Sequence, residues 1–202
     1  MEYRAARGRA LAVDKIGDLL EMTCAYDFVF VEYGIFPSEV RPDSVTAEGM
    51  EILKKFVSNK YITVGAQSGS GARLRELRRG HDTALIEQAV GIANDGGFSV
   101  HLDFIVGYPG ETGGEREETV AFIKRLNKKY TIRTHMHHFI PLSGSPYGFR
   151  LPSFLSPEAK EDLLRLKKAG IASGGWEQNE TQCHQFFYWL KNNFPGYYDR
   201  FR

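Results

Sequence analysis

The stretch Asp103–Thr112, which reads DFIVGYPGET, decides the fold of this 202-residue chain. An apolar run that breaks into Gly, Pro and Gly predicts a buried strand that ends in a tight turn. The acidic residues that follow, with Val120, Ile123 and Leu126 at helical spacing, predict a helix. Ligands of α/β proteins bind at the carboxyl ends of parallel strands, so we expect one at the turn 107–111.

Strand-like and helix-like segments alternate along the rest of the chain. Thr46, Asp82 and Ser156 are expected N-caps of helices. This alternation predicts an α/β fold of four parallel strand-helix units, in an open sheet or in part of a barrel. The first strand is dense in Phe and Val, which is typical of a central strand covered on both faces. The four expected strands are Asp27–Tyr33, Tyr61–Gly65, the segment through Asp103, and Thr131–Ile140.

Composition narrows the classes of function. Twenty-six Lys and Arg balance 25 Asp and Glu, so we expect no nucleic-acid partner and no membrane-surface partner. Cys24 and Cys183 lie far apart, which excludes a disulfide framework and a cysteine-bound metal. No apolar run approaches the roughly 20 residues of a membrane span, and no signal peptide is visible. We therefore expect a cytoplasmic protein.

Histidines and an aspartate could form a site on the predicted sheet. His101 and Asp103 share the polar face of their strand, which in a barrel points into the lumen; the alternative is a hydrogen-bonded core pair. His135 and His137 share one face of the next strand, as a metal site on a strand requires. No further ligand stands at a fixed spacing, so we predict ordinary histidines and no metal. A metal-dependent barrel hydrolase that uses all four residues is the alternative.

A turn of small residues follows the strand at Tyr61–Gly65. Gln67, Ser68 and Ser70 offer an amide, hydroxyls and backbone N–H groups, which suit the ribose or phosphate of a nucleotide-like ligand. The alternative is a simple strand-helix turn made by glycines. The segment is neither a phosphate-binding Walker loop nor a nucleophile elbow.

These motifs in succession resemble the radical S-adenosylmethionine superfamily, particularly its branch with N-terminal cobalamin-binding domains. The resemblance covers most of residues 10–170. Its motifs are Gln67-Ser68-Gly69-Ser70, Arg79-Gly80-His81, the DFIVGYPGET stretch, the Pro-Ser-Glu-Val-Arg-Pro loop at 37–42, and Phe139-Ile140-Pro141-Leu142.

The resemblance implies a six-unit partial TIM-type barrel, of which this chain would form the last four strands. On that mapping, residues 1–9 are a frayed N-terminus, 10–170 are the C-terminal part of the barrel, and 171–202 are an aromatic-rich helical extension. Arg79 would meet the carboxylate of S-adenosylmethionine, and Phe139 and Pro141 would complete the pocket. The implied cofactor-binding residues are Gln67, Ser68 and Ser70 for the ribose and amino-acid part, Ile105 and Gly107 for the adenine, and Arg79, Asp103, Phe139 and Pro141.

The chain departs from the family at the CxxxCxxC loop that holds a [4Fe-4S] cluster, because no such loop occurs in it. We therefore expect a fragment of a radical enzyme, inactive alone, that needs the missing N-terminal part of the barrel or a partner chain. The implied cofactors are S-adenosylmethionine, the cluster in the full-length enzyme, and cobalamin if this branch applies. The intact enzyme would abstract a hydrogen atom or transfer a methyl group; its partners are a small-molecule cofactor and a substrate that the sequence does not identify. A non-catalytic subunit that docks on a partner is a further alternative.

Overall fold

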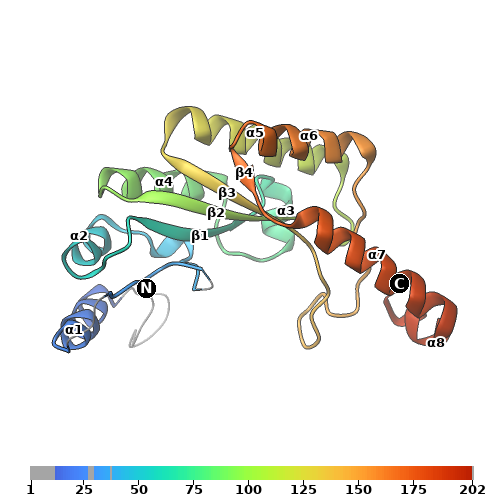
Figure 1. Ribbon diagram of the computed structural model, residues 1–202, viewed down its shortest axis with the longest axis horizontal. Coiled ribbons are helices and arrows are strands. Elements are labelled where there is room, and N and C mark those ends of the chain that lie inside the picture. The colour runs from blue at the N-terminus through green and yellow to red at the C-terminus, as the bar shows by residue number, and fades with distance from the viewer. Residues whose placement is uncertain (1–11, 27–29, 37, 202) are drawn as a thin grey trace.

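A four-stranded parallel sheet forms the centre of the molecule (Figure 1). The computed structural model describes residues 12–26, 30–36 and 38–201. Each strand pairs with the next one along the chain, which is the order of a barrel wall and not of a doubly wound sheet. The predicted α/β fold of parallel strands is confirmed. The strands, in spatial order, are β1 (Tyr61–Gln67), β2 (Ser99–Val106), β3 (Ile132–His138) and β4 (Ala172–Ser173).

Helices between the strands cover one face of the sheet. This layer contains α3 (Gly71–Glu76), α4 (Thr83–Asp95), α5 (Gly113–Lys129) and α6 (Pro157–Lys168). Alternate residues of β2 are buried toward these helices because successive side chains of a strand point to opposite faces. The predicted N-caps are confirmed, since the side chains of Thr46, Asp82 and Ser156 each accept a backbone N–H three residues on.

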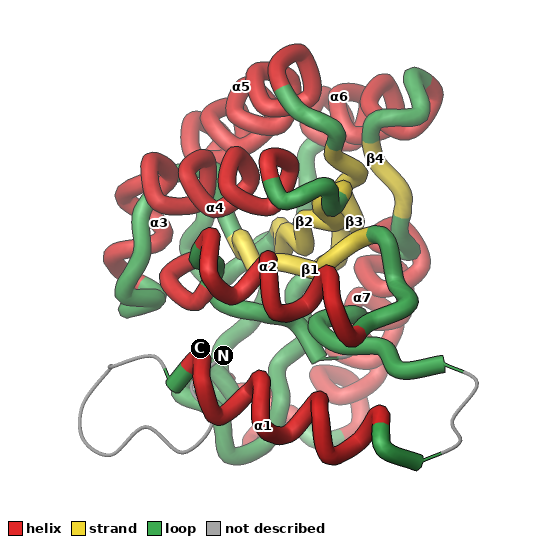
Figure 2. Tube along the Cα trace, turned by 90° about the vertical axis from the view of Figure 1, so that its left-hand side faces the viewer, coloured by secondary structure: helices red, strands yellow, loops and turns green. Residues whose placement is uncertain are grey.

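The N-terminal part of the described chain packs beside β1. It contains α1 (Val13–Cys24), the short 3-10 helix η1 (Pro42–Ser44) and α2 (Ala47–Phe56). α1 packs on α2 and α2 packs on α4, so α2 separates α1 from the sheet (Figure 2). The frayed terminus predicted for residues 1–9 lies outside the described residues.

The strand predicted at Asp27–Tyr33 is not confirmed within the described residues. Its first three residues lie outside the described part, residues 30–33 are not in a strand, and Phe30 is 75% exposed. The segment is bonded to the residues that precede β1: the backbone N–H of Ser58 donates to the carbonyl of Val31, and Asn59 bonds to the backbone of Tyr33. Val31 and Tyr33 are partly buried against the main core, whereas Phe30 before them and Glu32 between them are exposed. The described part of the segment is therefore covered on one side and not on both.

The C-terminal residues extend away from the sheet (Figure 1). They form α7 (Trp176–Asn193), α8 (Pro195–Tyr198) and the 3-10 helix η2 (Asp199–Phe201). Trp176 joins the main core, and farther along α7 a second, small core forms from Cys183, Phe187, Leu190 and Phe201. The strand β4, which precedes α7, was not predicted because two residues carry no periodic pattern. No helix in the described part of the chain combines the length and the apolar character needed to cross a membrane.

Candidate functional site

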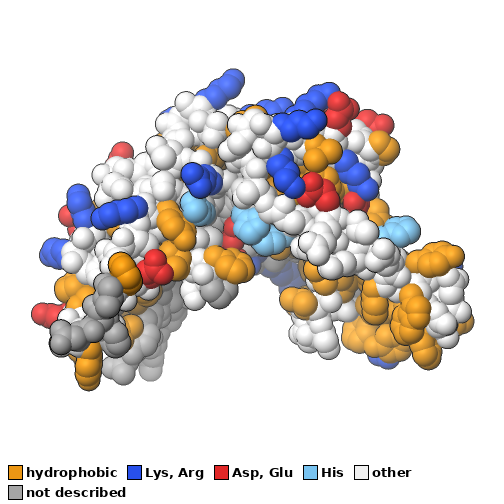
Figure 3. Space-filling view, in the orientation of Figure 1, with side chains coloured by type: hydrophobic (Ala, Val, Ile, Leu, Met, Phe, Trp, Pro, Cys, Tyr) orange, Lys and Arg blue, Asp and Glu red, His pale blue; other side chains and the backbone are white. Residues whose placement is uncertain are grey.

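The uncovered face of the sheet is polar. In β1, β2 and β3 the residues opposite to the helix layer include His101, Asp103, His135 and His137. In the space-filling view the molecule is hollowed between its N-terminal helices and its C-terminal extension, and histidines lie near the top of this hollow (Figure 3). A cavity of about 150 Å³ opens on this face. Its lining includes Phe36, Tyr61, Thr63, His101, Asp103, Arg133, His135 and Ser173.

Three side chains converge over Gly65 on this polar face. Gly65 pairs with Asp103 of β2, and its missing side chain leaves room above the strand. A Cβ atom at Gly65 would lie 2.6 Å from Glu39 Oε2, 2.9 Å from Gln67 Nε2 and 3.6 Å from Arg79 Nη2. An anion, an amide and a cation from three separate segments therefore meet at one point.

A β-bulge aims the side chain of Gln67 into this group. The register shifts between Gly65 and Gln67, and Gln67 has φ of +67°, a conformation that costs a non-glycine residue of order 1 kcal/mol or more. Tyr108 donates its hydroxyl to Gln67 Oε1 at 3.3 Å, and Gln67 Nε2 donates to Glu39 at 3.4 Å. Such strain is typical of ligand sites.

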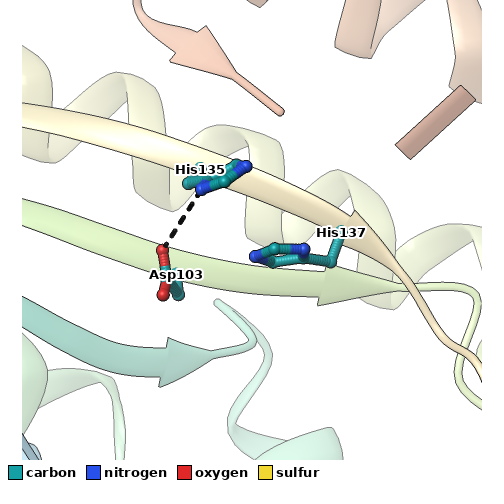
Figure 4. Close-up of side chains that lie close together, drawn as sticks. All are labelled: Asp103, His135 and His137. Atoms are coloured by element: carbon teal, nitrogen blue, oxygen red, sulfur yellow. Dashed lines mark ion pairs between the residues drawn. The ribbon is translucent and has the colours of Figure 1, made fainter. Parts of the chain in front are cut away.

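Asp103 is a buried carboxylate beside two histidines (Figure 4). Burial, and after it the nearby Glu39 carboxylate, together raise the pKa of Asp103 to about 7. His135 Nδ1 lies 4.0 Å from Asp103 Oδ1, and the rings of His135 and His137 are 4.3 Å apart. Burial and the neighbouring His135 lower the pKa of His137. Two imidazole rings thus stand next to a buried carboxyl group whose pKa is raised to about 7.

Some predicted residues lie away from this group. The ring of His101 stacks on that of Tyr61, with the ring centroids 4.0 Å apart. Of the four candidate metal ligands, the structure therefore brings only Asp103, His135 and His137 together among the described residues. Ser68 and Ser70 are fully buried: the Ser68 hydroxyl lies 3.4 Å from that of Thr119, and Ser70 caps α3. Their hydroxyls are engaged in the turn, and a contact with a ligand stays a prediction.

The other predicted pocket residues follow the ends of β2 and β3. Ile105 is half-buried and pairs with His137. The ring of Phe139 lies 5.5 Å from that of Tyr108. Pro141 lines a different, mainly apolar cavity of about 410 Å³ between the loop after β3 and the C-terminal helices. The predicted residues therefore divide between the polar face and the C-terminal extension.

Two residues hold the turn after β2, and the sequence reasoning did not assign them this role. Arg73, with a side chain only 2% exposed, donates to the carbonyls of Pro109 and Gly110 and to Glu115 Oε2. Glu111 Oε2 accepts the backbone N–H of Gly107 at 2.6 Å. Glu39 of the site was also missed. Glu111 and Glu39 stand in quoted motifs, whereas nothing in the sequence distinguishes Arg73 from a surface arginine.

The strand order, the single helix layer and the polar inner face define an α/β protein of the partial-barrel class. The family model described as the radical SAM superfamily matches residues 8–123, more than half of the chain, and the chain belongs to that superfamily. Coproporphyrinogen III oxidase (HemN) from Escherichia coli, a radical SAM enzyme, shares the fold with a TM-score of 0.56 and 20% identity. That match covers 79% of this chain and 36% of the oxidase.

Sequence relatives belong to longer proteins. The threonylcarbamoyladenosine tRNA methylthiotransferase MtaB of Thermotoga maritima is 30% identical over 137 residues, which cover 64% of this chain and 31% of that protein. The uncharacterized protein MJ0486 of Methanocaldococcus jannaschii is 36% identical over 89 residues, which cover 43% and 28%. The chain thus spans less than a third of the length of either relative.

Proposed function

We propose that this chain is the C-terminal part of the catalytic barrel of a radical S-adenosylmethionine enzyme and supplies a wall for the cofactor and the substrate. The observation that carries the proposal is the convergence of Glu39, Gln67 and Arg79 over Gly65. Arg79 Nε is buried without a hydrogen-bond partner, and no ion pair of its side chain is found among the described residues. Although Glu39 also reaches Gly65, a half-buried cation without an ion pair in the described part of the chain favours an anionic ligand, and the amino-acid carboxylate of S-adenosylmethionine provides one.

The chain's own residues have distinct tasks in this proposal. Arg79 binds the carboxylate, and Gln67, held by Tyr108, orients the polar part of the cofactor. Asp103, with its pKa near 7, holds or releases a proton on the substrate side. When S-adenosylmethionine is bound next to a reduced [4Fe-4S] cluster, it supplies the radical chemistry for hydrogen abstraction or methyl transfer.

The cluster does not fit the cysteines of this chain. Cys24 is exposed at the end of α1, and Cys183 is buried in α7. An iron-sulfur cluster needs several thiolates at one place, and these two cysteines lie in different parts of the fold. We propose that its ligands come from a preceding part of a longer chain or from a partner chain. No residue is assigned to cobalamin, whose use is implied by the resemblance alone.

The substrate class is proposed from charge. Several relatives are named as tRNA or ribosomal-protein methylthiotransferases, and these names describe those proteins. The balanced charge of this chain, 26 basic against 25 acidic residues, does not favour a polyanion such as RNA. We therefore propose a small-molecule substrate, and a cytoplasmic location stays a prediction.

The first experiment reads the DNA upstream of the Met1 codon in frame and expresses any longer product anaerobically. We expect a CxxxCxxC loop, the absorption of a [4Fe-4S] cluster, and dithionite-dependent formation of 5′-deoxyadenosine. In that longer protein Arg79→Ala should weaken the binding of S-adenosylmethionine while the cluster absorption stays unchanged. Arg78→Ala, an exposed neighbour, is the matched control.

Two results would contradict the proposal. One is a stop codon upstream with no partner that brings cluster ligands, and the other is equal cofactor affinity in the Arg79→Ala and Arg78→Ala variants. A calorimetric titration of the 202-residue chain alone separates the two parts of the argument. We expect this chain to bind S-adenosylmethionine weakly or not at all. A dissociation constant of micromolar or tighter would show that the cofactor does not need the N-terminal part of the barrel in order to bind.

A further inference from the structure

We propose that Asp103, His135 and His137 bind one divalent first-row transition-metal ion on the polar face of the sheet. One potential ligand atom from each side chain lies within 4.8 Å of the others. The site is separate from the cluster, because its donors are imidazoles and a carboxylate. It also goes beyond the proposed function, which does not require it.

The arrangement of the three residues follows from the sheet. His135 and His137 are two positions apart on β3, so they project from the same face, and Asp103 stands opposite His135 on β2. Figure 4 shows the three side chains gathered over the two strands. Zinc bonds of about 2.0–2.1 Å place tetrahedral ligand atoms about 3.3 Å apart. The ligand atoms lie within 4.8 Å of one another, so the side chains must close by up to about 1.5 Å, and both histidine rings are half-exposed.

Asp103 supplies the independent argument for a cation. Its side chain is 4% exposed, and its Oδ2 is buried with no hydrogen-bond partner among the described residues. Its one ion-pair contact in the described part of the chain is His135 Nδ1 at 4.0 Å, beyond hydrogen-bond length. Buried carboxylate oxygens are normally paired with a donor or coordinate a metal. A metal ion between Asp103 and the imidazoles would satisfy this oxygen.

The donor set defines the class of ion. Imidazole suits zinc, iron, copper and nickel, while magnesium and calcium prefer sets made of oxygen alone. Three protein ligands leave at least one coordination position open, which is the pattern of catalytic rather than structural sites. The polar face on which the site lies borders the hollow of Figure 3, so the open position is available to an oxygen or nitrogen atom of a small molecule.

The test titrates Zn²⁺ by calorimetry, and Co²⁺ by its visible absorption, into the full chain purified without a histidine tag and stripped with chelator. We expect one equivalent to bind. His135→Ala, His137→Ala and Asp103→Asn should each weaken binding by at least the roughly 10 to 100-fold cost of losing an outer-shell partner. His101→Ala, on the same face, and His184→Ala, on the exposed side of α7, are matched controls that should bind as the unmodified chain does.

Equal binding in the ligand variants and in the controls would overturn the proposal, as would the lack of stoichiometric binding by the unmodified chain. The two histidine variants change half-exposed side chains, so they should fold, and circular dichroism checks each variant. Neither S-adenosylmethionine nor a cluster enters the titration. Failure here therefore leaves the proposed radical enzyme standing, and failure of the Arg79 experiment leaves the metal site standing.

Discussion

Replacement of Glu111 by Gln should change how the stability of the chain depends on pH. Glu111 lies in the turn after β2 with its carboxylate almost fully buried, one oxygen bonded to the Gly107 N–H and the other without a hydrogen-bond partner among the described residues. Burial raises the pKa of Glu111 from its ordinary 4.5 to about 6, against the opposing effects of the Gly107 hydrogen bond and of Arg116. The fold therefore favours the protonated form of this carboxyl group more than water does.

The size of the effect follows from linkage. One pKa unit corresponds to about 1.4 kcal/mol, so the raised pKa of Glu111 is worth about 2 kcal/mol. Between the two pKa values the folded chain binds more protons than the unfolded chain, and stability falls as the pH rises. The contribution is fully present below about pH 4.5 and is lost as the pH rises through about 6.

Urea denaturation between pH 4 and 8, followed by tryptophan fluorescence, measures the effect. The stability of Glu111→Gln relative to the unmodified chain should rise by about 2 kcal/mol across this range, because glutamine does not ionise. Glu118→Gln, an exposed change on α5 that removes the same charge, gives the baseline. A difference that stays flat with pH, or that falls, would refute the assignment of a raised pKa to Glu111.

Three further substitutions test the packing. Arg73→Met should cost about 3–5 kcal/mol in chemical denaturation, because it leaves a carboxylate and two turn carbonyls without their buried partner; a loss below 1 kcal/mol would show that the clamp does not hold the turn. Gly107→Ala should lower the melting temperature more than Gly110→Ala, since both have positive φ but only at Gly107 would a Cβ meet neighbouring atoms; equal losses would contradict this. Phe187→Ala should cost about 3–5 kcal/mol of protection from hydrogen exchange in α7, and the exposed Phe186→Ala should not.

Local patterns predicted most of the framework. The DFIVGYPGET stretch forms the end of β2, its turn and the start of α5, because an apolar strand, a Gly-Pro turn and the capping Thr112 act over a few residues. The N-caps and the parallel order were predictable for the same reason. Asp27–Tyr33 shows the limit of such patterns. Its composition fits a strand covered on both faces, but a strand also needs neighbouring strands to pair with. A pattern of seven residues does not predict whether such strands are present.

The candidate site divides in the same way between sequence and structure. The sequence by itself determined the residue types, the alternation that puts Asp103 on one face of its strand, and the shared face of His135 and His137. Only the tertiary structure decided that Asp103 lies opposite His135, that His101 turns to Tyr61, and that Glu39 reaches Gly65. Strand register and loop position depend on contacts between segments far apart in the chain, so no local pattern contains them.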